Sequence, residues 1–347
     1  MLEKEWQTLI DVAEGKRFAL PPVALIIDSP WLPDYAGITH LDYYFLPDLW
    51  LKVNLQVERE FPNIIFLPSF WVEYGMLIEP SGLGAPFMWA PNSMPSAVKF
   101  LTSPEDIRRL KVPNPHRDGL MPPILNMYRF FSAKLKESGQ EIKMVASRGP
   151  LTTASFVYGL TDLLMGIKLE PEAMKKLLEI TTETVIVWLK AQLEAVPSAE
   201  GILVLDDIPG LMSLEDYSEF AHPYLMAIFA EFDGKLIAYH NDSNTTHILP
   251  RLAELDIHIF NFGKEVPLEN ILEHTYGKMA IMGNISPLEV LKEGTPEDVR
   301  REAQAVLAQA PDRYFILSVG GGVSPGTPKQ NVAVLERIAG GDYELGG

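Results

Sequence analysis

Eight short apolar runs, each closed by a polar or Gly/Pro cluster, constrain the fold of this chain more than any other feature. In chain order they are Pro22–Asp28, Asn63–Pro68, Lys143–Gly149, Gly201–Asp207, Lys235–Asp242, Ile257–Gly263, Lys278–Ser286 and Tyr314–Gly320. Runs that stay apolar at consecutive positions are typical of parallel strands buried on both faces. Eight is also the number of strands that closes a parallel barrel.

The stretches between these runs have helical patterns. Pro171–Val196 alternates apolar and charged residues at helical spacing, Ser213–Phe232 opens with a capping serine, and Pro296–Gln309 follows Thr295 as a predicted N-cap. Strand alternating with helix predicts an α/β fold, a (β/α)8 TIM barrel. An open doubly wound sheet is the alternative, but the glycine-rich phosphate motif typical of that fold does not follow an early strand.

The barrel is predicted to be one domain over residues 1–340, followed by a flexible tail at 341–347. A helical extension precedes the first strand. Between the second and third strands lies a long insertion, from Ser69 to Glu141, that exceeds the length of one helix. Its Trp71, Phe87, Met88, Trp89 and Met94 either form an aromatic lid over a ligand or pack as core beneath the insertion.

Charge and cysteine content exclude several classes of function. The chain has 29 basic and 46 acidic residues, a formal net charge of −17, which disfavours nucleic acid and anionic membranes as partners. It contains no cysteine, so it can form neither a thiolate metal site nor a thiol nucleophile. A charged amphipathic start and the lack of a long apolar run predict a cytoplasmic location. The oligomeric state stays open, with a homodimer as one alternative.

The loops after the strands build the active site in a TIM barrel, so polar residues at the strand ends are the candidate site. They are Asp28, Arg148, Asp206, Asp207, His240, Asn241, Asp242, Asn261 and Asn284, with Glu73 beyond the second strand and Gly320, Gly321 and Gly322 after the last. Carboxylates, an imidazole and carboxamides can bind a metal ion or surround a polar substrate.

His240 and Asp242 are alternate residues of one strand, so both can point into the mouth of the barrel and share a metal ion. Alternatively, His240 bonds to a carboxylate such as Asp206 in a network without metal. Asp206 and Asp207 can equally cap a helix at the barrel mouth. The run of three glycines can admit a planar ligand to the backbone, or form a tight turn.

Five segments carry a resemblance to a known family: YAGITHLDYYFLPDLWLKVNLQVEREF, SRGPLTTASFVYGLTDLL, DDIPGLMSLEDYSEFAHPYL, MGNISPLEVLKEGTPEDVRREAQAVL and GGGVSPGTPKQNV. In this order they resemble the uroporphyrinogen decarboxylase-like superfamily. More closely they resemble its corrinoid-linked methyltransferase branch, the methylcobamide:coenzyme M and O-demethylase methyltransferases. The resemblance covers nearly the whole chain and implies a (β/α)8 barrel.

The same resemblance bears on the choice of branch. True uroporphyrinogen decarboxylases carry an arginine-rich segment near the first strand and a histidine in the last glycine motif. Here the first region reads IIDSPWLPDYAGI, without arginine, and Gly321 stands at the histidine position. The methyltransferases bind zinc through a His-x-Cys motif and a second cysteine. His240 matches that histidine, whereas Asp242 and Gly321 occupy the cysteine positions.

The resemblance therefore implies a corrinoid-dependent methyltransferase, which moves a methyl group between a small substrate and the cobalt of a corrinoid partner protein. The substrate, a small-molecule methyl donor or acceptor, is of ether, methylamine, alcohol or thiol type. The expected catalytic residues are His240, Asp242, Asp206 and Glu73. His240 and Asp242 hold zinc or another divalent metal, and Gly320, Gly321, Gly322 and Asn284 contact the cofactor, methylcobalamin. The alternatives are a uroporphyrinogen decarboxylase and a non-catalytic corrinoid- or tetrapyrrole-binding homologue.

Overall fold

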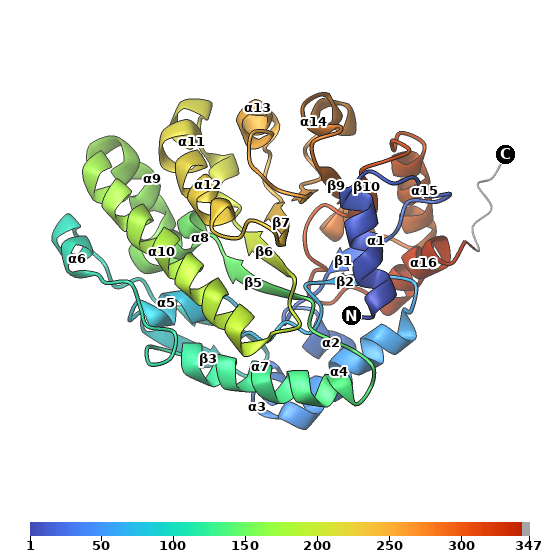
Figure 1. Ribbon diagram of the computed structural model, residues 1–347, viewed down its shortest axis with the longest axis horizontal. Helices are drawn as coiled ribbons and strands as arrows, with labels where there is room; N and C mark the ends of the chain where they lie inside the picture. The colour runs from blue at the N-terminus through green and yellow to red at the C-terminus, as the bar shows by residue number, and fades with distance from the viewer. Residues whose placement is uncertain (342–347) are drawn as a thin grey trace.

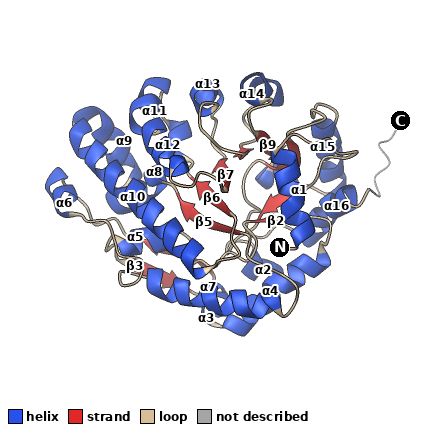
Figure 2. Ribbon diagram, viewed as in Figure 1, coloured by secondary structure: helices blue, strands red, loops and turns tan. Residues whose placement is uncertain are grey.

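Each of the eight apolar runs contains a strand in the computed structural model, which describes residues 1–341. The strands are β1 (Ala24–Ile26), β2 (Ile65–Leu67), β5 (Met144–Arg148), β6 (Gly201–Leu205), β7 (Leu236–Asn241), β8 (Ile259–Phe262), β9 (Ala280–Ile285) and β10 (Phe315–Val319). They form the centre of the molecule and helices surround them (Figures 1 and 2). The tail predicted at 341–347 falls, except for its first residue, outside the described residues, and the prediction of a single domain stays a prediction.

The strands pair in parallel but do not form a closed ring. Strands β5 to β10 make one six-stranded sheet, and β1 and β2 make a separate pair. Two isolated bridges, Val23 with Leu317 and Ile26 with Gly322, join β1 to β10. On the other side, β2 and β5 share no ladder within residues 1–341. The α/β architecture is confirmed, whereas a barrel closed by hydrogen bonds is corrected to one with an open seam between β2 and β5.

Side chains bond to the edge of β5 at this seam. Gln192 of α10 (Pro171–Ala195) donates from Nε2 to the carbonyl oxygen of Ala146, at 3.0 Å. Oε1 of Glu79, from α5 (Ile78–Gly82), accepts from the backbone N–H of Arg148 at 2.9 Å and from the Ser147 hydroxyl at 2.7 Å. Because these side chains satisfy polar groups along the edge of β5, it is stable without β2 as a direct neighbour.

The apolar runs are buried on both faces. The inward positions, among them Ala24, Ile26, Ala146, Leu205 and Met282, form an interior cluster, and the residues between them pack on the surrounding helices. Helix α1 (Glu3–Ala13) covers the amino ends of the strands and lies in front of them in Figure 1. Its Trp6 packs so closely on Gly201, the first residue of β6, that a Cβ there would lie 2.6 Å from the ring.

The surrounding helices agree with the sequence pattern in two cases and differ in one. Helix α10 confirms the first prediction, and α15 (Pro296–Leu307) has Thr295 as its N-cap, as predicted; the structure adds that Thr295 and Asp298 form a capping box. The stretch Ser213–Phe232 forms two helices, α11 (Leu214–Phe220) and α12 (His222–Ala230), instead of one. The division falls at Ala221 because Pro223 has no N–H to continue the helical hydrogen bonds.

The remaining helices connect these elements. They are α2 (Leu32–Ala36), α3 (His40–Phe45), α4 (Pro47–Glu60), α7 (Met121–Lys136), α8 (Pro150–Tyr158), α9 (Leu160–Leu169), α13 (Leu249–Leu252), α14 (Leu268–Thr275) and α16 (Lys329–Ala339). Three short helical turns follow β6, β7 and β9, at Ile208–Leu211, Thr246–Ile248 and Pro287–Lys292.

The long insertion holds α5, a hairpin of β3 (Phe87–Ala90) and β4 (Ser93–Ala97), α6 (Pro104–Arg109) and α7. The hairpin was not predicted. Its Trp89 ring lies 5.4 Å from the ring of Tyr74 and 4.9 Å from that of Phe45, whereas Met88 is 63% exposed. These aromatic residues therefore pack against one another above the start of the insertion.

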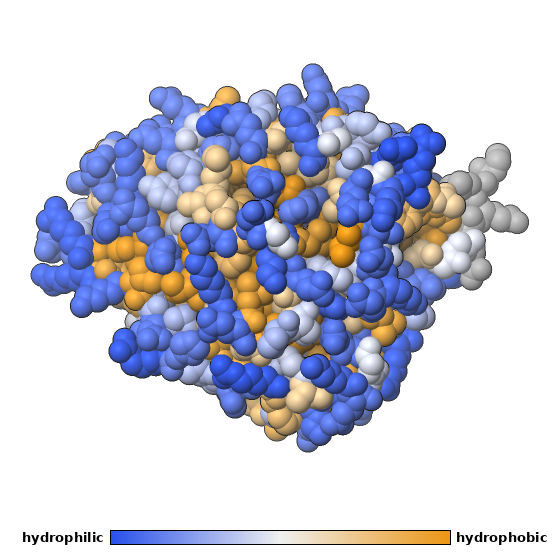
Figure 3. Space-filling view, viewed as in Figure 1, coloured by the Kyte–Doolittle hydropathy of each residue, from blue (hydrophilic) through white to orange (hydrophobic). Residues whose placement is uncertain are grey.

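Charged and polar side chains cover most of the face seen in Figure 3, with smaller hydrophobic areas between them. Among residues 1–341, no helix combines the length and the apolar character needed to cross a membrane.

Candidate functional site

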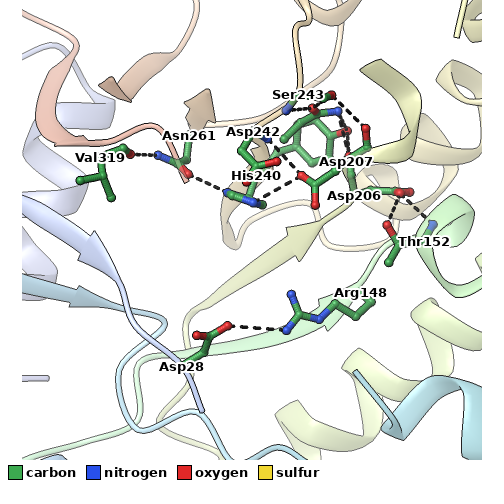
Figure 4. A network of polar contacts seen from close by, with 12 residues as sticks. Asp28, Arg148, Thr152, Asp206, Asp207, His240, Asp242, Ser243, Asn261 and Val319 are labelled. Atoms are coloured by element: carbon green, nitrogen blue, oxygen red, sulfur yellow. Dashed lines mark hydrogen bonds and ion pairs between the residues drawn. The ribbon is translucent and has the colours of Figure 1, made fainter. Parts of the chain in front are cut away.

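His240, near the end of β7, lies at the centre of a polar network at the carboxyl ends of the strands (Figure 4). Its imidazole is 5% exposed, and Nδ1 lies 2.6 Å from Oδ1 of Asn261. The amide nitrogen of Asn261 donates to the carbonyl oxygens of Met282 and Val319, at 2.8 and 3.1 Å. These two bonds fix the amide so that its oxygen faces His240. In the neutral imidazole Nδ1 therefore carries the proton, and Nε2 is the nitrogen that can bind a metal ion.

Two carboxylates lie beside Nε2 of His240. Nε2 of His240 lies 3.4 Å from Oδ1 of Asp207, and the ligand atoms of Asp207, His240 and Asp242 all lie within 4.8 Å of one another. Asp207 comes from the loop after β6, and Asp242 directly follows β7. Within the cluster His240 is buried, Asp207 is half-buried and Asp242 is exposed, so the cluster is open to solvent on the side of Asp242.

The loop that carries Asp207 is bonded firmly to β7. Tyr239 and Asn241 donate to the carbonyl oxygen of Asp206, at 3.0 and 2.9 Å, and the Ser243 hydroxyl donates to the carbonyl oxygen of Asp207 at 2.9 Å. The Asp207 carboxylate itself accepts from the backbone N–H of Asp242, at 3.0 Å. The loop of Asp207 is therefore held against the β7 region by bonds that do not depend on contacts within the cluster.

The chemistry of this cluster fits a divalent metal ion. One neutral imidazole nitrogen and two carboxylates are ligands that Zn²⁺ and harder ions such as Mn²⁺ accept. A ligating histidine usually donates its other N–H to an oxygen, as His240 does to Asn261. Although Asp242 is exposed, surrounding protein atoms desolvate its carboxyl group; this desolvation and the repulsion of Asp207 raise its pKa to about 6. A bound cation would remove that repulsion.

Asp206 lies elsewhere than the sequence suggested. Its side chain points away from His240 and is fully buried at the start of α8 (Figure 4). Its two carboxylate oxygens accept from the backbone N–H groups of Leu151 and Thr152, at 3.0 and 2.8 Å, and from the Thr152 hydroxyl at 2.7 Å. Burial raises its pKa to about 7, against the lowering effect of these bonds. The contacts are those of a helix cap, one of the two roles that the sequence left open.

Glu73 belongs to a second group in the mouth, with Asp28 and Arg148. Nη2 of Arg148 lies 3.5 Å from Oε2 of Glu73 and 3.8 Å from Oδ2 of Asp28. The other oxygen of Glu73 accepts from the backbone N–H of Ser29, at 2.9 Å. Burial, followed by the repulsion of Asp28, raises the pKa of Glu73 to about 8, and burial raises that of Asp28 to about 6.

The glycines expected to contact a cofactor have structural contacts of their own. Gly321 has a φ of +147°, and a Cβ there would lie 3.2 Å from Oδ2 of Asp242. Gly322 bridges to Ile26 and so joins β10 to β1. The carboxamide of Asn284 donates to the carbonyl oxygen of Val266, at 2.9 Å. Gly321 is thus the member of this set that borders the metal-ligand cluster.

Sequence reasoning named His240 and Asp242 but did not place Asp207 as their third partner, or Asn261 as the residue that orients the imidazole. The strand-end position was the available signal for both, and it did not separate Asp206 from Asp207. Adjacent residues at a strand end point in opposite directions, and only the tertiary structure shows which of them faces the mouth.

Parallel strands that gather ionisable side chains at their carboxyl ends define the chain as a barrel-type α/β protein of an enzyme class. It belongs to the uroporphyrinogen decarboxylase (URO-D) family, whose model matches residues 5–339. Curated relatives include the uroporphyrinogen decarboxylase of Prochlorococcus marinus (strain NATL2A), 28% identical over 356 residues, with 94% of each chain covered. That of Anaeromyxobacter sp. (strain Fw109-5) is 28% identical over 243 residues, or 67% of each chain.

Solved structures that share the fold include the following two. A methyltransferase from Methanosarcina mazei aligns with a TM-score of 0.82 at 21% identity, over 98% of this chain and 99% of that one. A B12-independent methionine synthase from Shewanella sp. W3-18-1 aligns with a TM-score of 0.60 at 14% identity, over 93% and 97%. At these identities the likeness shows a common fold.

Proposed function

We propose that this chain is a metal-assisted methyltransferase that exchanges a methyl group between a small substrate and the cobalt of a corrinoid partner protein. One observation carries the proposal. Nε2 of His240 lies beside two carboxylates, those of Asp207 and Asp242, while the opposite ring nitrogen is bonded to the amide oxygen of Asn261. An oriented imidazole beside paired carboxylates is suited to hold a divalent cation.

The three side chains would hold the metal, which when bound would polarise the substrate atom that carries the methyl group. The chain's own residues position the side chains that would hold the metal. Asn261 keeps His240 in one tautomer, and Tyr239, Asn241 and Ser243 of the β7 region fix the loop of Asp207. With an ether as donor, the oxygen would keep the electron pair of the C–O bond and gain a proton, and the cobalt(I) of the partner protein, as second substrate, would supply the electron pair that accepts the methyl group.

The competing function is uroporphyrinogen decarboxylation, which the names of the curated relatives favour. Two features of this chain speak against it. The segment after the first strand, IIDSPWLPDYAGI, has no arginine, and Gly321 replaces the histidine of the decarboxylase motif. The M. mazei methyltransferase shares the fold along nearly the whole chain, which is compatible with methyl transfer but does not select it.

The test has two measurements on the purified chain. Elemental analysis should find one divalent metal ion per chain, lost in His240→Ala and Asp242→Ala and retained in the control His116→Ala, whose histidine is exposed. Methyl transfer should then be assayed with reduced and methylated cobalamin, with and without a cognate corrinoid protein, against ethers, methylamines and thiols. Release of CO2 from uroporphyrinogen, or no methyl transfer with any substrate, would overturn the proposal.

A further inference from the structure

Arg148 is a buried cation in the mouth of the barrel. It is the last residue of β5, and only 6% of it is exposed. Its side chain extends into the space between Asp28 and the His240–Asp207 pair (Figure 4). The guanidinium carbon lies 4.7 Å from the centre of the Trp71 ring, which supports it from one side. Trp71 and the backbone of β5 therefore hold the cation in a defined place.

The hydrogen-bonding capacity of this guanidinium is largely unused. The group has five N–H donors, but its nearest acceptors lie 3.5 Å and 3.8 Å from Nη2, on Glu73 and Asp28. Charge-assisted bonds of this kind are normally about 2.7–2.9 Å long. Nε is buried and has no hydrogen-bond partner among the described residues. A buried guanidinium whose acceptors are this distant, and whose Nε has no partner among the described residues, is costly, which indicates that an acceptor from outside the chain completes the site.

Hydrogen bonds to neighbouring residues hold Glu73 and the backbone of Arg148 in place. Glu73 is tied to the N–H of Ser29 through its other oxygen, at 2.9 Å, and Glu79 holds the backbone N–H of Arg148, at 2.9 Å. Burial and the neighbouring Asp28 raise the pKa of Glu73 to about 8, which favours its protonated form and weakens its contribution to offsetting the charge of Arg148. A protonated Glu73 can also donate a hydrogen bond to an incoming anion.

We infer that Arg148 binds the carboxylate of the substrate, and that the substrate is a small methylated acid whose methyl-bearing end points toward His240, Asp207 and Asp242. The inference rests on the proposed function and narrows it to one substrate class. A planar guanidinium matches a carboxylate in a two-point contact, which would orient the substrate along the line from β5 to β7. Arg148 would act as a binding and orienting residue, separate from the metal-ligand cluster.

Three matched methyl ethers test the charge preference. They are methoxyacetate, the neutral 2-methoxyacetamide and the cationic 2-methoxyethylammonium, titrated into the purified full chain by isothermal titration calorimetry. Methoxyacetate should bind about tenfold or more tightly than the amide, because it gains hydrogen bonds between two charged groups. Equal affinities, preference for the ammonium probe, or no measurable binding of methoxyacetate would overturn the inference.

Variants locate the effect. Arg148→Gln should abolish the preference for methoxyacetate over the amide, and Arg148→Lys should retain only part of it, because lysine lacks the planar fork. Asp28→Asn removes the competing carboxylate and should tighten methoxyacetate binding; this variant serves even if Arg148→Gln does not fold. Asp34→Asn, on the exposed side of the nearby helix α2, makes the same change of net charge and should leave the affinity unchanged. Equal effects of the two aspartate variants would count against the inference.

The binding measurement needs neither a corrinoid protein nor turnover. It therefore distinguishes a failure of the proposed function from a failure of the inference about Arg148. If methoxyacetate binds through Arg148 but no methyl transfer occurs with any donor, the proposed function fails and the anion site remains. If methyl transfer proceeds with neutral or cationic donors and not with carboxylates, the proposed function holds and the inference about Arg148 fails.

Discussion

The substitution Asp206→Asn separates a structural carboxylate from a catalytic one. The Asp206 side chain is fully buried, and its two oxygens accept three hydrogen bonds from Leu151 and Thr152 at the start of α8. Asparagine has nearly the same shape, but it replaces one acceptor oxygen by an NH2 donor. Whichever way the amide turns, that donor faces a backbone N–H group, and at least one buried hydrogen bond is lost.

The size of the effect follows from these contacts. A hydrogen bond to a buried charged group contributes about 1.5–3 kcal/mol, and a buried N–H left without an acceptor costs about 1–3 kcal/mol. Together they predict that Asp206→Asn lowers the free energy of unfolding by about 3 kcal/mol, a change of more than about a hundredfold in the folding equilibrium. Metal content and substrate binding of the folded fraction should stay close to those of the natural chain.

The neighbouring substitution Asp207→Asn is the matched control, since its side chain is 43% exposed and faces His240. It should change stability by less than about 0.5 kcal/mol and reduce metal content sharply. Urea unfolding, followed by circular dichroism, and elemental analysis measure the two effects on the same samples. An Asp206→Asn variant that unfolds at the natural urea concentration but loses metal or activity would refute the capping role and restore Asp206 to the catalytic set.

Three further predictions concern the same region. Asn261→Leu should weaken metal binding about 10–100-fold, measured by competition with a chelator, because the tautomer of His240 is no longer fixed; unchanged affinity would contradict this. Gly321→Ala should lower the free energy of unfolding, since φ is +147° and a methyl group would press on Asp242; urea unfolding measures it, and an unchanged midpoint would exclude the strain. The pKa of Glu73 is raised to about 8, so its protonated form stabilises the fold fully below about pH 4.5, and this contribution is lost as the pH rises through about 8. The urea midpoint should fall over that range, and less in Glu73→Gln; equal slopes would rule Glu73 out as a source.

The sequence predicted where in the fold the site lies, but it predicted only some of the residues that form it. Position at a strand end is a property of the sequence, and it identified His240 and Asp242. It could not rank Asp206 against Asp207, because the choice depends on the direction of each side chain after the strand. Nor could it reveal that Arg148 is buried on Trp71 with unused donors, since Trp71 lies 77 positions earlier in the chain.

The amino-acid sequence by itself determined the eight strands, their parallel order and the edge at which polar side chains collect. Continuous apolar runs are needed to bury both faces of a strand, and that requirement is local enough to read along the chain. The tertiary structure alone decided that the ring stays open between β2 and β5, where Glu79 and Gln192 bond to the edge of β5. It also decided that Nε2 of His240 faces Asp207, because hydrogen bonds between distant segments set the direction of each group, and local residue patterns do not record such contacts.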